Sequence, residues 1–183
     1  MPSEGSPIVR GMFAWEIQEA RRVFANSLNY DRVRIHEMAS WPNSFDRAGR
    51  WLKRMPPPTQ SNAITLGYHL FFPGRLVDTL VGPGNPEHYK ISWLIHELTH
   101  AWQYQRMGWG YLIQALAAQQ KYGGRVYDFG GETGLRESFS AGKRLKDFNL
   151  EQQGDICRTF YDHWAGGQDL SAWLPYIHEI QNG

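Results

Sequence analysis

Residues 91–107 read ISWLIHELTHAWQYQRM, and this stretch decides the architecture of the chain. Apolar residues recur through it at helical spacing and give it a broad apolar surface, which is typical of a buried helix. A Gly/Pro-rich run precedes residue 87, and glycines follow at 108 and 110. Because glycine commonly ends helices, the sequence predicts a long, buried helix over Glu87–Met107.

This helix carries the pattern H-E-x-x-H at His96, Glu97 and His100. Residues i and i+4 share a helix face, so both imidazoles can bind one metal ion. Zinc at such a site lowers the pKa of a water molecule and polarises the scissile carbonyl. Glu97 can take the water's proton and pass it to the leaving amine. The alternative is a pair of core histidines that bind backbone carbonyls. Burying these three side chains without compensation is costly, so we predict a catalytic zinc site.

A catalytic zinc ion needs three protein ligands and one open position. A nearby third histidine is excluded, because the residues that follow His100 are AWQYQRMG. Glu151 and Asp155 are spaced i and i+4 in the later run LEQQGD. One of them can therefore bind metal while the other orients a ligand imidazole. Two other acids compete for the role of third ligand, Glu132 and Glu137.

The composition favours a single domain over residues 1–183. The chain has 19 Lys+Arg against 18 Asp+Glu and no long basic run, so it lacks the electrostatic footprint of a nucleic-acid-binding protein. No stretch approaches the roughly 20 apolar residues needed to span a bilayer. The single cysteine, Cys157, cannot form an internal disulfide. The amino terminus has no apolar run typical of a secretory signal. We expect a protein without membrane partners, cytoplasmic in the producing cell, whose export would need a route without a signal peptide.

The other patterns predict mostly helices, with strands confined to the first half of the chain. Further helices are expected at Ala14–Leu28, Phe45–Met55, Tyr111–Tyr122, Glu151–Trp164 and Ala172–Gln181. Strands are expected at Val33–His36 and within Ala63–Phe72, the latter with a turn or bulge at Gly67. A glycine-rich loop is expected over Gly123–Gly134. This order predicts an α+β fold in which a small sheet packs beside the metal-binding helix.

The run HELTHAWQYQ, followed downstream by E-x-x-x-D, resembles the gluzincin branch of zinc peptidases, typified by thermolysin. This resemblance implies a zincin-like fold. It also implies that His96, His100 and Glu151 bind zinc, that Glu97 is the general base and that Asp155 supports a ligand histidine. One departure is the separation of His96 and Glu151, which is 55 residues (151 − 96) and longer than in thermolysin.

A longer match covers about residues 31–105. The runs YDRVRIHE, AITLGYHLFFPG and WLIHELTHAWQYQ are similar to a metallopeptidase domain associated with bacterial extracellular contractile injection systems. In that domain an L-E-x-x-x-D segment often follows, as it does at Leu150–Asp155. The resemblance implies a bacterial effector or toxin-associated protein that works with a secretion or injection system, and it identifies no substrate.

Peptide hydrolysis also needs a hydrogen-bond donor for the developing oxyanion. In the gluzincin arrangement a Tyr or His supplies it, and we prefer His163, which follows Glu151 on the same expected helix. The other candidates are Tyr104, Tyr127, Tyr161 and His178. The expected function is that of a zinc metallopeptidase acting on a peptide or protein. The alternatives are a zinc amidase acting on cell-wall peptides and a zinc-binding effector or partner-binding module without turnover.

Overall fold

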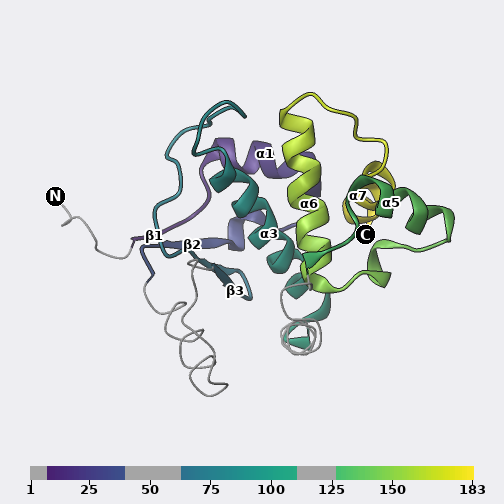
Figure 1. The fold of residues 1–183 in the computed structure, drawn as a ribbon. Coiled ribbons are helices and arrows are strands. Elements are labelled where there is room, and N and C mark those ends of the chain that lie inside the picture. The colour runs from purple at the N-terminus through teal and green to yellow at the C-terminus, as the bar shows by residue number, and fades with distance from the viewer. Residues whose placement is uncertain (1–7, 40–62, 111–126) are drawn as a thin grey trace, which may run out of the picture.

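The computed structural model describes residues 8–39, 63–110 and 127–183, in which helices surround one side of a small sheet (Figure 1). The described elements are β1 (Ile8–Arg10), α1 (Ala14–Phe24), η1 (Tyr30–Arg32), β2 (Arg34–Glu37), β3 (Ile64–Leu66), β4 (His69–Phe71), α3 (Tyr89–Met107), α5 (Gly131–Ser140), η3 (Leu145–Asp147), α6 (Leu150–Ala165) and α7 (Leu174–Asn182). The α+β class is confirmed, and every described strand precedes α3. The helices expected at Phe45–Met55 and Tyr111–Tyr122 lie outside the described residues.

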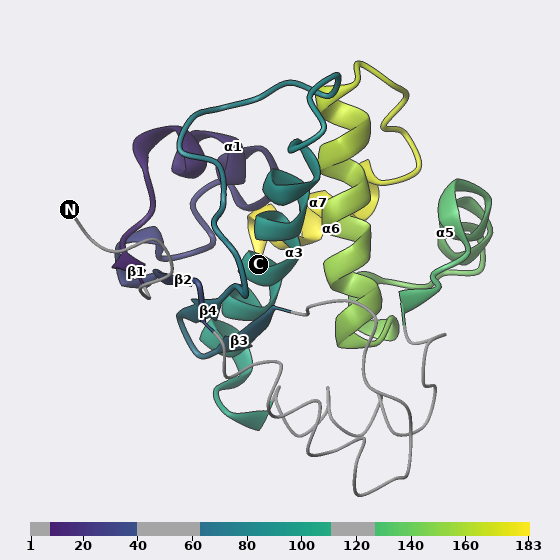
Figure 2. The same ribbon diagram turned by 60° about the vertical axis from the view of Figure 1, so that its left-hand side comes forward.

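The four strands form one sheet in the order β1-β2-β4-β3. β1 pairs with β2 and β3 with β4 in antiparallel fashion, whereas β2 and β4 are parallel. The turn expected at Gly67 is confirmed, since its φ of 66° lies in the left-handed region that favours glycine. A Cβ at Gly67 would lie 3.3 Å from Cε1 of Tyr104 in α3. The β3–β4 hairpin is therefore set directly beside α3 (Figure 2).

α3 is the central element and confirms the expected buried helix. From Ile91 to Gln103 every residue except Trp93 is buried. The helix ends as expected at Gly108, whose φ is 59° and whose N–H donates to the carbonyl of Tyr104 at 2.8 Å. α6 packs along α3 in both views (Figures 1 and 2). The largest core side chains come from the sheet and from several helices, among them Phe24, Ile35, Leu70, Phe72, Leu94, Leu98, Leu135, Tyr161 and Tyr176.

The loop predicted over Gly123–Gly134 lies partly outside the described residues, and within them α5 begins at Gly131. Gly130, immediately before it, has a φ of 85°. A Cβ at Gly134 would lie 2.7 Å from the carbonyl oxygen of Phe129. Gly130 and Gly134 thus form a tight helix entry, which composition does not distinguish from a loop. β1 was likewise not predicted, since three residues carry too little alternation to identify a strand.

The described residues also bear on the expectations about membrane-spanning helices and about the single cysteine. Among them, no helix is both long and apolar enough to cross a membrane. Cys157 is buried and has no disulfide.

Candidate metal centre

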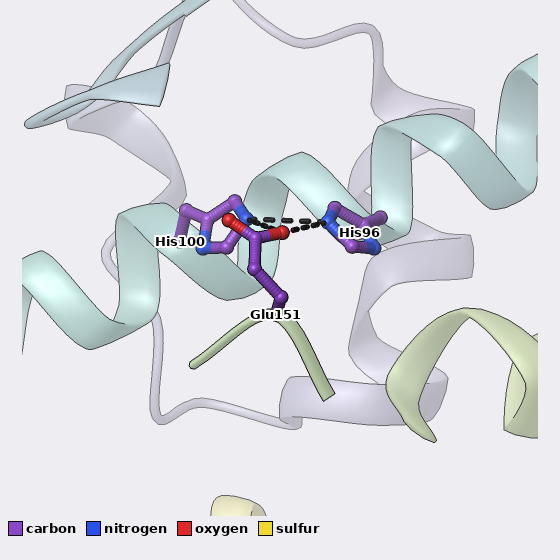
Figure 3. Close-up of side chains that lie close together, drawn as sticks. All are labelled: His96, His100 and Glu151. Atoms are coloured by element: carbon purple, nitrogen blue, oxygen red, sulfur yellow. Dashed lines mark hydrogen bonds and ion pairs between the residues drawn. The ribbon is translucent and has the colours of Figure 1, made fainter. Parts of the chain in front are cut away.

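Three side chains from two helices converge on one point (Figure 3). His96 and His100 project from the same face of α3, and Glu151 reaches them from the first turn of α6. The Nε2 atoms of the two histidines are 3.2 Å apart. Glu151 Oε2 lies 3.3 Å from Nε2 of His96 and 3.4 Å from Nε2 of His100. The three atoms therefore form a nearly equilateral triangle.

This triangle has the dimensions that a tetrahedral metal ion requires. Zinc with ligand distances of about 2.0–2.1 Å separates its ligand atoms by about 3.3–3.4 Å. Two imidazoles and one carboxylate also form a donor set of catalytic zinc sites, which keep a fourth position open. The arrangement and the chemistry of His96, His100 and Glu151 thus fit a possible metal-binding triad.

The start of α6 determines where Glu151 lies. Asn149 and Gln152 form a reciprocal capping box, in which Gln152 N donates to Asn149 Oδ1 at 2.9 Å and Asn149 N donates to Gln152 Oε1 at 3.0 Å. Such a box fixes the first turn of a helix. Glu151 is the second residue of that turn, and its carboxylate therefore projects toward α3 from a fixed backbone.

The second ring nitrogen of His96 faces Asp155, as the sequence predicts for a supporting acid. Nδ1 of His96 lies 3.1 Å from Asp155 Oδ1, and Arg158 Nε lies 3.1 Å from the same oxygen. Burial lowers the pKa of His96, but Asp155 and Glu151 more than offset this and raise it to about 10. The pKa of Glu151 is lowered, since the two histidines outweigh the effect of its own burial. In the metal-free protein, His96 and Glu151 therefore form an ion pair.

His100 has a different second partner, which the sequence analysis did not identify. Its Nδ1 lies 2.8 Å from Oε1 of Gln103, one turn further along α3. Gln103 is completely buried and in turn contacts Gln153 of α6. The ring nitrogens of both histidines thus face side chains, which argues against the alternative of core histidines that bind backbone carbonyls.

The carboxylate of Glu97 contacts β3, the strand at the edge of the sheet. The hydroxyl of Thr65 in β3 donates to Glu97 Oε2 at 2.7 Å and approaches the Glu97 carbonyl oxygen at 3.2 Å. Glu97 is only 4% exposed, so this hydrogen bond holds a buried carboxylate in place. The charge of Glu97 also raises the pKa of His96 and of His100, which puts its carboxylate within electrostatic range of both.

The competing third ligands lie elsewhere. Glu132 and Glu137 are on α5 and are exposed, and Glu132 Oε1 accepts a hydrogen bond from Arg136 at 2.8 Å. Among the described acids, Glu151 completes the triad with the two histidines.

The preferred oxyanion donor, His163, does not lie at this triangle. It is 12 residues beyond Glu151 on α6, about 18 Å along the helix axis, and its ring packs on Trp173 with centroids 4.2 Å apart. Tyr127 is nearer, with its ring centroid 6.2 Å from that of His96. Burial and the charges of Glu151, Glu97 and Asp155 raise the pKa of its phenol.

The remaining oxyanion-donor candidates have contacts with residues outside the triad. Tyr161 Oη donates to Glu19 at 2.9 Å within the core. Tyr104 packs against Tyr68 and Trp109, and His178 is exposed on α7. Tyr127 is therefore the weighed candidate that the structure brings beside the triad.

The chain is similar in sequence to part of a type VI secretion protein. No model of a known protein family matches this chain. Over 152 residues, or 83% of the chain, the sequence is 29% identical to the type VI secretion system spike protein VgrG2b of Pseudomonas aeruginosa. The matching region is only 13% of that protein's length.

The structural comparison gives the same neighbour. The fold is similar to the effector domain of Pseudomonas aeruginosa VgrG2b, with a TM-score of 0.55 and 22% identity, over 91% of this chain and 83% of that domain. The chain is thus similar to an effector domain of a type VI secretion spike protein. The similarity is to a protein of the kind that the sequence patterns indicated, an effector domain of a bacterial secretion system.

Proposed function

We propose that this chain is a zinc-dependent peptide-bond hydrolase with a zincin-like fold, related to the gluzincins. One observation carries the proposal. Nε2 of His96, Nε2 of His100 and Oε2 of Glu151 lie 3.2–3.4 Å apart, and the buried carboxylate of Glu97 is held on the adjacent face of the same helix. A purely structural metal site needs no such carboxylate beside it.

In this proposal each residue has one task. Zinc, when bound by His96, His100 and Glu151, would activate a water molecule and polarise the scissile carbonyl. Glu97 accepts a proton from the attacking water and transfers it to the departing nitrogen. The hydroxyl of Thr65 keeps the Glu97 carboxylate in one orientation during both transfers.

We assign the oxyanion donor to Tyr127 in place of His163. Its ring lies beside that of His96, and its raised pKa keeps the phenol protonated and able to donate a hydrogen bond. A donor aimed at the developing charge is typically worth about 10²–10³ in kcat. His163 lies too far along α6 for this task.

We further propose that the domain acts as an effector delivered by a secretion apparatus and needs no signal peptide of its own. The similarity to the VgrG2b effector domain supports this, and since it covers 91% of the chain, residues 1–183 are proposed to be one domain. The substrate class is a peptide or protein, with cross-linked cell-wall peptides as the substrates of the amidase alternative.

The test is cleavage of a mixed peptide library and of purified cell-wall peptides by zinc-loaded wild type and Glu97→Gln, with products identified by mass spectrometry. We expect wild type to cleave and Glu97→Gln to be inactive while it keeps its zinc. Cleavage of cell-wall peptides alone would favour the amidase. A zinc-loaded wild type that cleaves neither substrate, or a Glu97→Gln variant as active as wild type, would contradict the proposal.

A further inference from the structure

Two glutamines form a buried bridge between α3 and α6 behind His100. Gln103 is 0% exposed and Gln153 is 6% exposed. An amide side chain is costly to bury unless its donors and acceptor are satisfied. Here both amides are satisfied, and the pattern of partners determines which way each one points.

The orientation of Gln153 is set by the backbone just before α6. Its Nε2 lies 3.2 Å from the carbonyl oxygen of Leu145 and 3.0 Å from that of Phe148. Carbonyl oxygens only accept hydrogen bonds, so the amide nitrogen must face them. Oε1 of Gln153 is left to accept from Gln103.

The orientation of Gln103 follows from that of Gln153. Its Nε2 donates to Gln153 Oε1 at 3.0 Å and to the carbonyl oxygen of Leu150 at 3.0 Å. Both amide hydrogens are then used, and Oε1 of Gln103 faces His100 Nδ1 at 2.8 Å. An oxygen that accepts requires a donor opposite it, so His100 carries its hydrogen on Nδ1.

This tautomer leaves the lone pair of His100 on Nε2, the atom that faces His96 and Glu151. We propose that Gln103 and Gln153 are positioning residues that fix the metal-binding tautomer and ring orientation of His100. The inference rests on the proposed metal site. The hydrogen bonds that run from His100 through Gln103 and Gln153 (the relay) end on the carbonyl oxygens of Leu145, Phe148 and Leu150. The same bonds therefore also tie the start of α6, and with it Glu151, to α3.

The two histidines are thus supported by different chemistry. His96 faces a carboxylate, Asp155, whereas His100 faces a neutral amide whose direction is imposed by a second amide. A lone glutamine could rotate by 180° and present its nitrogen to Nδ1, which would favour the tautomer with a hydrogen on Nε2. Gln153 and the carbonyl of Leu150 oppose that rotation.

Two substitutions at residue 103 separate support of His100 from general packing. Gln103→Glu keeps an acceptor for the His100 N–H but loses both amide donors, whereas Gln103→Leu loses all three bonds. We expect Gln103→Leu to weaken zinc binding about 10–100-fold, the usual effect of losing a ligand's supporting partner. Gln103→Glu should bind zinc within about threefold of wild type, although its metal-free form melts at a lower temperature.

Zinc affinity is measured by competition with a chelator, and the melting temperature is measured on metal-free protein. Gln181→Leu is the control: it removes the amide of a half-buried glutamine on α7 that donates to the Arg22 carbonyl at 3.0 Å, and it should bind zinc normally. Equal losses of zinc affinity in Gln103→Glu and Gln103→Leu, or no loss in Gln103→Leu, would overturn the proposal.

A measurement on wild type keeps the test independent of whether the variants fold. In zinc-loaded protein labelled with ¹⁵N, we expect the His100 ring to show a slowly exchanging hydrogen on Nδ1 and none on Nε2. A hydrogen on Nδ1 that exchanges as fast as that of a solvent-exposed imidazole would overturn the relay but leave the proposed function standing. Failure of wild type to bind zinc at all would overturn the proposed function and this inference with it.

Discussion

Gly154 of α6 lies directly against the imidazole ring of His96. A Cβ at residue 154 would lie 2.7 Å from Cε1, 2.9 Å from Nδ1 and 3.0 Å from Nε2 of that ring. The missing side chain lets α6 approach closely enough for Glu151 and Asp155, on either side of Gly154, to contact the two nitrogens of one ring. This explains a glycine in a helix interior, where it costs about 1 kcal/mol relative to alanine.

Gly154→Ala should therefore weaken zinc binding by at least about tenfold, even though alanine favours the helix. The added methyl group must displace either the His96 ring or α6, and both movements open the triad. Chelator competition measures the loss. Gly74→Ala is a suitable control, because a Cβ there meets nothing within 4 Å. Equal zinc affinities of Gly154→Ala and wild type would show that the close packing is not needed for the site.

Thr65 provides a test of how Glu97 is held. Thr65→Val keeps the shape of the side chain but removes the hydroxyl that donates to Glu97 Oε2. A hydrogen bond to a charged group is worth about 1.5–3 kcal/mol, so kcat should fall roughly 10–100-fold while zinc content stays unchanged. Thr65→Ser, which restores the donor, should recover most of the activity. Loss of zinc in Thr65→Val would instead indicate that Thr65 supports the metal site itself.

Substitution of Glu151 and of Asp155 by alanine should lower zinc affinity by different amounts. Glu151→Ala removes an oxygen of the triad and leaves two histidines, which hold zinc poorly. Asp155→Ala removes only the partner of His96 Nδ1 and should lower zinc affinity about 10–100-fold. A titration against a zinc chelator ranks the variants.

Glu132→Ala and Glu137→Ala are the controls for this ranking. Both remove an exposed acid of α5 and should bind zinc like wild type. A large loss in either of them, together with normal binding by Glu151→Ala, would exclude the proposed third ligand.

Metal binding and protons should compete at the triad. The pKa of His96 is raised from 6.5 to about 10 in the metal-free protein, so zinc must displace its proton at pH 7. The heat of zinc binding should therefore depend on the ionisation enthalpy of the buffer, and zinc affinity should rise with pH. Calorimetry in two buffers of different ionisation enthalpy measures the protons released, and identical heats in both would contradict the competition.

The same shifts predict how the metal-free protein responds to pH. A raised histidine pKa gives stability that is fully present below about 6.5 and is lost as the pH rises toward about 10. The lowered pKa of Glu151 gives stability that is present above about 4.5 and is lost in acid. The melting temperature of metal-free protein should thus fall between pH 7 and pH 10. His96→Ala, which lacks the ion pair, should show a smaller fall.

Local spacing made the centre of this site predictable from sequence. The i, i+4 pairs His96/His100 and Glu151/Asp155 each lie on one helix face, and the structure brings the two pairs together. The resemblance to gluzincins supplied what spacing alone did not, namely which acid joins the two histidines. Gly67 and the C-terminal end of α3 were also predicted, because their causes lie within a few residues in the chain, whereas α3 begins at Tyr89 rather than at Glu87.

The features that were missed depend on contacts between distant parts of the chain. Gly154 matters only because α6 packs on His96, and the roles of Gln103 and Gln153 appear only when both amides face each other. Thr65 lies 32 residues before Glu97, and no local pattern links them. His163 was preferred because it shares a helix with Glu151, but the helical rise carries it away from the triad.

Metal content tests the central claim most directly. Wild type, His96→Ala and His100→Ala are loaded with excess zinc, dialysed mildly and analysed for bound metal. If His96, His100 and Glu151 form one tetrahedral site, wild type keeps about one zinc per chain, and both variants keep far less while remaining folded. Well under one zinc per wild-type chain, with no recovery when zinc is added, would contradict the account.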